Sequence, residues 1–280
     1  MTITTFPLGG DLPVNRLGFG AMRLARNTFD GPARDPGTGR AVLRRAVELG
    51  VNHIDTAGFY GVGDVWANEM IRTALTPYPE GLVIATKVGP LLGPTGRPTG
   101  QAAPDQLRGL VEGDLRALGL DRLDLVYLRV GAAGGPGGES IGERFAVLAQ
   151  LREEGLIRHL GVSNVDLAQF QEARSVAPVT AVQNAYADDM ALLAECERAG
   201  IAYVPYFPLG GGHTPLDTTR LEKVAARLGA TVPQVALSAL LASSPSVLAI
   251  PGTGSVEHLE ENLGASGLAL GERELAELRG

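Results

Sequence analysis

An acid and a phenol follow one short apolar segment of the chain. Segment 51–54 reads as a strand, Asp55 stands at its end, and Tyr60 follows five residues later. Parallel sheets and barrels carry their functional side chains at the carboxyl ends of strands, so this spacing is compatible with a reactive site. Taken alone, the spacing has low specificity and favours a purely structural role.

A lysine stands at the corresponding place of the next expected strand. Lys87 follows segment 82–86 and is one of only two lysines in the chain. A lysine in a barrel interior needs a partner, and Asp55 at the neighbouring strand end can supply it. We expect the ammonium to lower the pKa of Tyr60 by favouring its phenolate, and Tyr60 to act as a general acid toward a carbonyl oxygen. The alternative is an ordinary ion pair at the rim of a barrel.

Short apolar segments alternate with helical patterns along the whole chain. The expected strands are 17–20, 51–54, 82–86, 123–128, 157–162, 179–183, 201–206 and 247–250. The expected helices are 40–49, 64–75, 105–118, 140–154, 166–173, 187–199, 221–228, 232–241 and 256–262. Such alternation indicates a parallel sheet. Eight units within 280 residues predict a (β/α)8 TIM barrel, which typically has about 250 residues, as one domain over residues 1–280.

Two local patterns refine this interpretation. Residues 6–14 predict an N-terminal β-hairpin with a Gly-Gly-Asp turn. A doubly wound sheet is the alternative fold, but no Gly-x-Gly-x-x-Gly motif follows the first strand.

Composition excludes several classes of protein. The chain has 45% hydrophobic and 20% charged residues, which favours a globular fold over disorder. A net charge of -7 argues against binding to nucleic acid or to an anionic membrane. We see no signal peptide and no apolar run of about 18 residues, so we expect a cytoplasmic protein. The single cysteine, Cys196, allows no internal disulfide, and no Cys/His spacing predicts a metal site.

Six segments together resemble the aldo-keto reductase family over the length of the chain. They are 52–61, 85–89, 161–164, 182–186, 206–210 and 250–255. The resemblance implies a (β/α)8 barrel, an NAD(P)H cofactor at its mouth, and hydride transfer to an aldehyde or ketone. It identifies Asp55, Tyr60 and Lys87 as three of the family's four catalytic residues.

The fourth catalytic position departs from the family. A histidine normally follows the fourth strand, whereas here segment 123–128 is followed by Arg129. Arginine cannot shuttle a proton, but it stays charged and can bind a carbonyl oxygen or an anionic group. A local salt bridge is the alternative. Arginine at this place is similar to the bacterial pyridoxal reductase (pyridoxine 4-dehydrogenase) branch, whose substrate has an ionisable hydroxyl beside its aldehyde; other small aldehydes or ketones remain alternatives.

The resemblance also implies the residues that contact the cofactor. Ser163, Asn164 and Gln183 would hold the nicotinamide carboxamide, since they offer donors and acceptors; a helix cap is the alternative for Ser163 and Asn164. Tyr206 would stack on the nicotinamide or merely pack at the rim. The glycine-rich segment 209–213 would let backbone approach the pyrophosphate, or be only flexible. The remaining expected contacts are Gly20, Met22, Phe207, Leu209 and Gly210.

The segment after the eighth expected strand reads as an anion site. The turn Gly252, Thr253, Gly254 and Ser255 leads into a helix, whose free N–H groups suit the adenosine 2′-phosphate. Many NADPH-specific family members have Lys and Arg at the positions of Gly252 and His258, so the cofactor choice stays open here. Glu261 and Asn262 match the adenine contacts. We expect NADPH, with NADH as the alternative. For His258 the alternative is an ordinary residue on a helix surface.

The resulting hypothesis is an NADPH-dependent reductase, a monomer or weak homo-oligomer, whose substrate is an aldehyde and most specifically pyridoxal. A regulatory protein that binds the nucleotide with little turnover is the alternative from another class. The absent histidine supports that alternative, whereas the set of Asp55, Tyr60 and Lys87 argues against it, because binding alone needs no tuned phenol.

Overall fold

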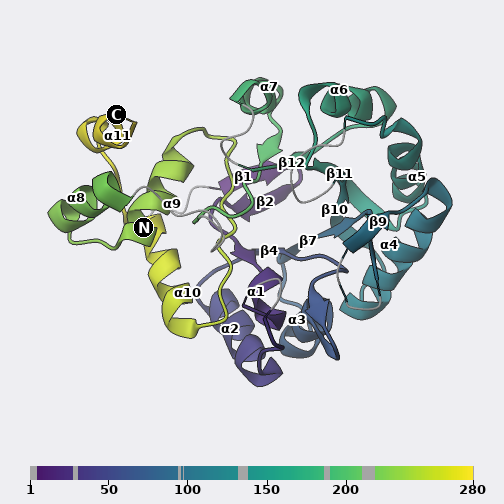
Figure 1. The fold of residues 1–280 in the computed structure, drawn as a ribbon, viewed down its shortest axis with the longest axis horizontal. Helices are drawn as coiled ribbons and strands as arrows, with labels where there is room; N and C mark the ends of the chain where they lie inside the picture. Colours follow the sequence, from purple (N-terminus) through teal and green to yellow (C-terminus); the bar gives the residue numbers. More distant parts are fainter. Residues whose placement is uncertain are drawn as a thin grey trace.

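The structure is a computed structural model that describes residues 5–27, 31–93, 96, 98–131, 138–185, 190–209 and 218–279. Its centre is a parallel sheet of seven strands with helices around it (Figure 1). From one edge to the other, the strands are β13 (Ala202–Tyr203), β12 (Ala181–Gln183), β11 (Ile157–Ser163), β10 (Leu123–Arg129), β7 (Val83–Val88), β4 (His53–Asp55) and β3 (Phe19–Gly20). Every neighbouring pair is parallel, as the alternation of strands and helices predicts.

A segment near the C-terminus joins the two edges of this sheet. Leu17, just before β3, pairs in parallel with Ala249, and Tyr203 of β13 pairs in parallel with Val247. The Leu248 N–H also donates to the Tyr203 carbonyl at 2.9 Å. The sheet is therefore closed, and the expected (β/α)8 barrel is confirmed.

The eighth expected strand, 247–250, is not a regular strand. The Arg16 side chain donates to the carbonyls of Val247, Leu241 and Ser244. The Val247 oxygen therefore accepts a hydrogen bond from a side chain. Pro251 has no N–H with which to continue the strand. The barrel is thus completed by single bridges at this position.

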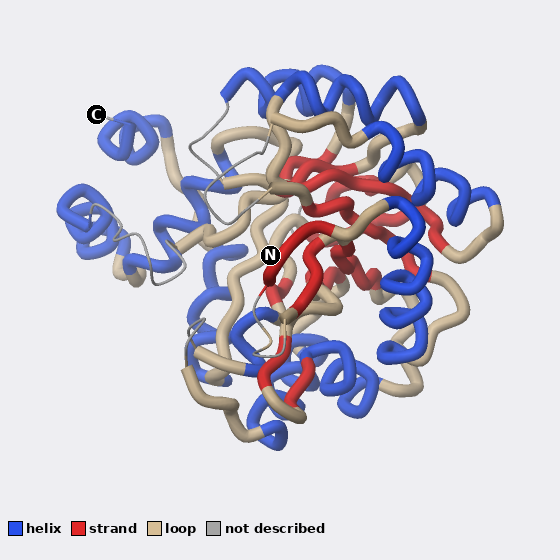
Figure 2. Tube along the Cα trace, turned by 45° about the vertical axis from the view of Figure 1, so that its right-hand side comes forward, coloured by secondary structure: helices blue, strands red, loops and turns tan. Residues whose placement is uncertain are grey.

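Helices enclose the barrel in both ribbon and tube views (Figure 2). They are α2 (Pro36–Glu48), α3 (Ala67–Leu75), α4 (Pro104–Leu118), α5 (Gly142–Glu153), α6 (Leu167–Val176), α7 (Met190–Ala199), α9 (Val232–Ala242) and α10 (Val256–Leu263). Helix α8 (Thr218–Leu228) packs on α9 to the side of the barrel. Several begin where the sequence supplies an N-cap. The side chains of Asp35, Asp166 and Thr231 accept the N–H of the third helical residue of α2, α6 and α9.

Some boundaries differ from the expected ones. Helix α2 begins at Pro36 rather than at residue 40, because the Asp35 cap and a proline in the first turn outweigh the two glycines that follow. Helix α3 begins at Ala67 rather than at residue 64, because β5 (Gly61–Val62) and β6 (Val65–Trp66) form a hairpin first. The elements that the sequence did not predict are α1 (Met22–Ala25), β8 (Pro90–Leu92), β9 (Pro98–Gln101), η2 (Gly264–Gly267) and α11 (Glu272–Arg279).

The expected N-terminal hairpin is present and covers one end of the barrel. It consists of β1 (Thr5–Leu8) and β2 (Leu12–Asn15). Its buried apolar side chains form one cluster with side chains of the barrel interior from β7, β10, β12 and β13. Asp11 in its turn bonds to Arg158 and His159 at the beginning of β11. The hairpin therefore closes the end of the barrel at which the strands begin.

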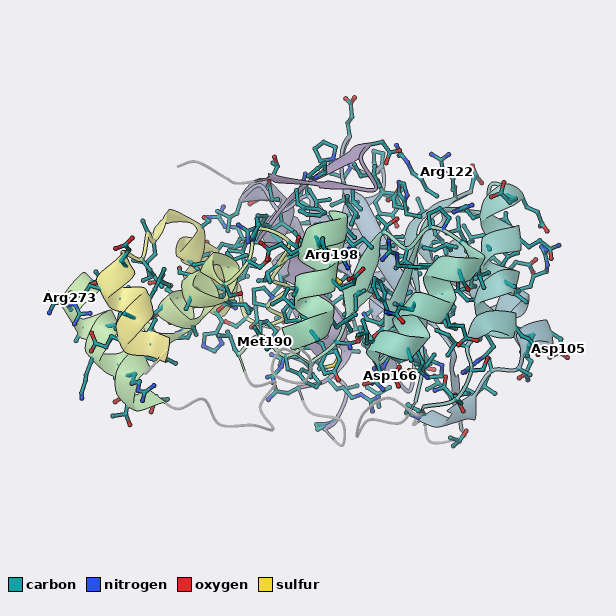
Figure 3. All side chains as sticks on the ribbon, turned by 90° about the horizontal axis from the view of Figure 1, so that it is seen from above. Asp105, Arg122, Asp166, Met190, Arg198 and Arg273 are labelled. Carbon is teal, nitrogen blue, oxygen red and sulfur yellow. The ribbon has the colours of Figure 1, made fainter. Side chains whose placement is uncertain are left out.

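The opposite end is the mouth, where the strands end and the next helices begin. Figure 3 shows Asp105, Asp166 and Met190, near the starts of α4, α6 and α7, toward the lower edge of the molecule. Arg122, just before β10, and Arg198, near the end of α7, lie nearer the upper edge. The helix starts that follow the strand ends therefore face the lower part of this view.

Two measurements concern only the described ranges. No single helix there is long and apolar enough to cross a membrane. Helices α8 and α9 have the required length and apolar composition only as a pair, and a bend of 100° separates them. No group of three or more His, Cys, Asp or Glu side chains in those ranges is arranged to hold a metal ion.

Candidate active site

The candidate catalytic side chains come from neighbouring strand ends, as the barrel geometry requires. Asp55 is the last residue of β4, Lys87 is the next-to-last residue of β7, and Arg129 is the last residue of β10. These three strands are adjacent in the sheet. Tyr60 lies in the segment after β4, where its N–H donates to the Ala57 carbonyl at 3.0 Å.

Asp55 and Lys87 form a buried ion pair. Lys87 Nζ lies 2.5 Å from Asp55 Oδ1, and the two side chains are 2% and 3% exposed. Gln183 Nε2 donates to the other oxygen, Asp55 Oδ2, at 2.7 Å, and Lys87 Nζ also donates to the Thr56 carbonyl at 3.0 Å. Each carboxylate oxygen thus has a donor, so the expected pairing is confirmed and the buried charge is compensated.

The Tyr60 phenol lies over this pair. Lys87 Nζ is 4.8 Å from the centroid of the Tyr60 ring. Burial raises the pKa of Tyr60 above 10.0, and the charge of Lys87, a hydrogen bond from it and the charge of Arg129 offset only part of that rise. Lys87 therefore lowers the pKa of Tyr60 as expected, but desolvation of the phenolate raises it by more, so that the net shift is upward. Tyr60 carries its proton at neutral pH.

Lys87 remains an ammonium despite its burial. Desolvation alone lowers its pKa, but the Asp55 carboxylate and the Tyr60 phenol raise it by more, so that the net pKa lies above 10.5. The site therefore holds a fixed positive charge directly beside a protonated phenol.

Arg129 has a buried nitrogen without a partner. Its Nη1 is inaccessible to solvent and bonds to none of the described residues, and the guanidinium carbon lies 5.5 Å from the centroid of the Tyr206 ring. No ion pair joins Arg129 to a carboxylate of the described residues, so they do not supply the local salt bridge that was the alternative. Since a buried unpaired N–H is costly, this nitrogen is suited to bind an oxygen of a ligand.

A cavity of about 420 Å³ extends from Tyr60 and Asp55 to helix α10. Most of the expected cofactor residues line it. They are Gly20, Met22, Gln183, Tyr206, Phe207, Leu209, Gly252, Thr253, His258, Glu261 and Asn262. Ser163, Asn164, Gly254 and Ser255 are not among its lining residues, and Gly210, with the rest of the expected pyrophosphate segment 210–213, lies outside the described residues.

Ser163 and Asn164 do not cap the helix that follows them. Helix α6 is capped by Asp166, so the alternative role of a cap is wrong for both. The Ser163 hydroxyl is buried and has no partner among the described residues. Asn164 has φ 60, and its amide donates to the Val130 carbonyl at 2.8 Å. An unsatisfied hydroxyl beside an asparagine in a strained conformation indicates a binding position.

The turn 252–255 approaches the first strand closely. A Cβ atom at Gly252 would lie 2.5 Å from the Gly20 carbonyl oxygen, and one at Gly20 would lie 2.6 Å from that of Ile250. Both glycines are thus required by the packing of backbone on backbone at the cavity wall. Ser255 is the N-cap of α10, since its hydroxyl accepts the His258 N–H at 3.4 Å. His258 is exposed to solvent while also lining the cavity.

A buried carboxyl group behind Lys87 was not predicted. Asp114 of α4 accepts from Thr86 Oγ1 at 2.6 Å and from Asn68 Nδ2 at 3.0 Å, and Asn68 Oδ1 accepts from Thr56 Oγ1 at 2.7 Å. Burial raises the pKa of Asp114 to about 7. The signal in the sequence was an acid at helical spacing on an otherwise apolar face, seven residues after Leu107.

The raised pKa of Asp114 predicts how stability depends on pH. Because the folded protein binds this proton more tightly than the unfolded chain, its stability falls as pH rises from about 4 to about 7, by at most about 4 kcal/mol. Replacement Asp114→Asn should remove this part of the slope and make the variant more stable than the parent above pH 7. Urea denaturation at several pH values measures it, with Asp105→Asn at an exposed position of α4 as the control. Parallel pH profiles of Asp114→Asn and the parent would contradict the prediction.

The barrel and its site define an oxidoreductase of the aldo/keto reductase family, to which this chain belongs: the family model matches residues 16–280. Among characterised relatives, pyridoxine 4-dehydrogenase of Escherichia coli strain K12 is 48% identical over 287 residues, which cover 100% of this chain and 99% of that protein. An uncharacterized oxidoreductase of Schizosaccharomyces pombe is 40% identical over 96% of this chain and 87% of its own length.

Solved structures agree with this assignment. A thermostable aldo-keto reductase in complex with the inhibitor epalrestat superposes with a TM-score of 0.81 at 32% identity, covering 98% of both chains. An aldo-keto reductase from Klebsiella pneumoniae in complex with NADPH gives a TM-score of 0.82 at 26% identity, covering 99% of this chain and 94% of that one.

Proposed function

We propose that this protein is an NADPH-dependent carbonyl reductase that transfers hydride to an aldehyde, with pyridoxal as its substrate and pyridoxine as the product. The observation that carries the proposal is the protonated Tyr60 beside the buried Lys87–Asp55 pair, at one end of a cavity with an unpartnered arginine nitrogen nearby. The 48% identity to a pyridoxine 4-dehydrogenase over its full length supports the choice of substrate.

The described residues fit a nicotinamide dinucleotide. The unsatisfied Ser163 hydroxyl, together with Asn164 and Gln183, would hold the carboxamide, and Tyr206 would lie against the nicotinamide ring. Thr253, Glu261 and Asn262 line the far end of the cavity, where the adenosine end of the dinucleotide would lie. When bound, the reduced nicotinamide supplies the hydride for the carbonyl carbon.

Tyr60 donates the proton that the reduced carbonyl requires. As negative charge develops on the carbonyl oxygen, the phenol transfers its proton there, and the resulting phenolate is stabilised by the ammonium of Lys87. Asp55 holds Lys87 in this position through the 2.5 Å contact. The high pKa of Tyr60 in the free site ensures that the proton is present when the substrate arrives.

Arg129 takes the place that the resemblance assigns to a histidine, and we assign it to orienting the substrate. Pyridoxal has an ionisable ring hydroxyl beside its aldehyde, so one guanidinium can bind that oxygen or the carbonyl itself. The buried free nitrogen of Arg129 has the donor capacity for this contact.

The test is the oxidation of NADPH by pyridoxal, followed by absorbance and by chromatography of the product. Formation of pyridoxine supports the proposal. Clear binding of NADPH without oxidation by pyridoxal or by a panel of other aldehydes and ketones would instead favour a regulatory nucleotide-binding role. Turnover of other carbonyl compounds but not of pyridoxal would support the reductase activity and contradict pyridoxal as the substrate.

Replacement Arg129→Met should lower kcat/KM for pyridoxal by about 10- to 100-fold, since a charge-assisted contact to the substrate is lost. An aldehyde without the neighbouring hydroxyl should be affected less if the ring oxygen is the contact. Steady-state kinetics with both substrates measure this, and Arg129→Lys, which keeps the charge, serves as the comparison. Unchanged constants for pyridoxal in Arg129→Met would show that Arg129 does not contact the substrate.

A further inference from the structure

A guanidinium from the segment before α2 lies directly on the turn 252–255. Arg34 Nη2 donates to the Gly254 carbonyl at 3.1 Å. A Cβ atom at Gly254 would lie 2.4 Å from the Arg34 guanidinium carbon, so the arginine occupies the space of a side chain there. The turn and Arg34 are 220 residues apart in the sequence, and no local pattern links them.

Arg34 keeps its charge and most of its donors available. Its hydrogen bonds to described residues go to two neutral oxygens, the Gly254 carbonyl and Asn27 Oδ1, the latter 3.2 Å from Nη1. The adjacent carboxylate of Asp35 is occupied by the N–H and the hydroxyl of Thr38. A guanidinium has five N–H groups, so three of them remain for an anion.

A second arginine adds positive charge at the same place. Arg23 Nη1 donates to the same oxygen, Asn27 Oδ1, at 3.4 Å, and Arg23 lines the cavity. Arg23 is the only lysine or arginine among the described lining residues. Two guanidinium groups thus converge on one neutral oxygen near this end of the cavity, whose lining also includes Glu261. Two cationic groups at one place suit a ligand group with more than one negative charge.

We propose that Arg34 binds the 2′-phosphate of NADPH and thereby selects NADPH over NADH. The proposal rests on the proposed function in one respect, namely that the dinucleotide lies in this cavity with its adenosine end at the turn 252–255. The planar fork of arginine matches phosphate oxygens. Arg34 would thus bring from a distant segment the cation that positions 252 and 258 do not provide, since they are Gly252 and His258.

The experiment compares equilibrium binding of two pairs of ligands to the full-length protein. Fluorescence titration gives Kd for NADPH and NADH, and calorimetry gives Kd for adenosine 2′,5′-bisphosphate and adenosine 5′-monophosphate. Replacement Arg34→Gln should raise Kd about 10- to 100-fold for the two ligands with a 2′-phosphate and leave the other two nearly unchanged. Replacement Arg44→Gln, which removes the same charge from an exposed position of α2, should change none of the four.

Each other outcome is informative. An equal loss for NADPH and NADH would place Arg34 at the pyrophosphate and overturn the proposal, and so would unchanged binding of all four ligands. Should Arg34→Gln fail to fold, Arg34→Lys keeps a cation at the turn and should bind the 2′-phosphate ligands with intermediate affinity. These readouts need no turnover, so failure of pyridoxal as a substrate leaves this test intact, and loss of binding by Arg34→Gln leaves the substrate test of the parent intact.

Discussion

Replacement of Tyr60 by phenylalanine is expected to lower kcat for carbonyl reduction by about 10²- to 10⁴-fold while NADPH binds as before. The substitution removes only the phenol oxygen, and the ring that lies 4.8 Å from Lys87 Nζ is retained. Steady-state kinetics give the loss in kcat, and a fluorescence titration shows whether NADPH still binds.

Tyr78→Phe is the matched control for this loss. Tyr78 also has a partly buried hydroxyl, which donates to the Leu118 carbonyl at 2.6 Å, and it precedes β7, at the end of the barrel where the strands begin. Its replacement should reduce stability slightly and leave kcat unchanged. If Tyr60→Phe kept kcat within about threefold of the parent, the proton would have to come from another donor and the assignment of Tyr60 would be wrong.

Replacement Lys87→Met should lower both activity and the free energy of unfolding, the latter by about 3–5 kcal/mol. The loss arises because Asp55, whose side chain is 3% exposed, would keep a buried charge with Gln183 as its remaining side-chain donor. Urea denaturation measures the loss, and activity should fall because the phenolate of Tyr60 is no longer stabilised. Lys223→Met provides the control, since Lys223 is the only other lysine and is exposed on α8.

A double variant separates the two effects of Lys87. In Asp55→Asn/Lys87→Met no unpaired charge remains, so part of the stability should return while activity stays low. If Lys87→Met alone were as stable as the parent, the ion pair would contribute nothing to the fold. Recovery of activity in the double variant would show that Lys87 acts only as a structural partner of Asp55.

The sequence was sufficient for the parts of this protein that depend on local pattern. Alternating strands and helices predicted the barrel, and the position of a residue at a strand end predicted that Asp55 and Lys87 meet. The irregularity of the eighth strand was less predictable, because Arg16, which donates to the Val247 carbonyl, lies 231 residues away in the sequence. Long-range contacts of this kind leave no periodic signal.

The same limit applies within the site. The choice between NADPH and NADH stayed open at Gly252 and His258 because the arginine on that turn, Arg34, precedes it by more than two hundred residues. The effect of Lys87 on the pKa of Tyr60 was predicted in the right direction, but the larger opposing effect of burial was not, because the depth of burial is not visible in the sequence. The buried carboxyl group of Asp114 was not predicted, although the sequence places this acid on an otherwise apolar helix face.

The N-terminal hairpin determines from which end of the barrel ligands can reach the site. It packs into the interior from the end where the strands begin, whereas Tyr60 and the long cavity lie at the other end. Cofactor and substrate therefore enter and leave through the same opening, the mouth of the barrel. In such an arrangement the ligand that binds deeper enters first and leaves last.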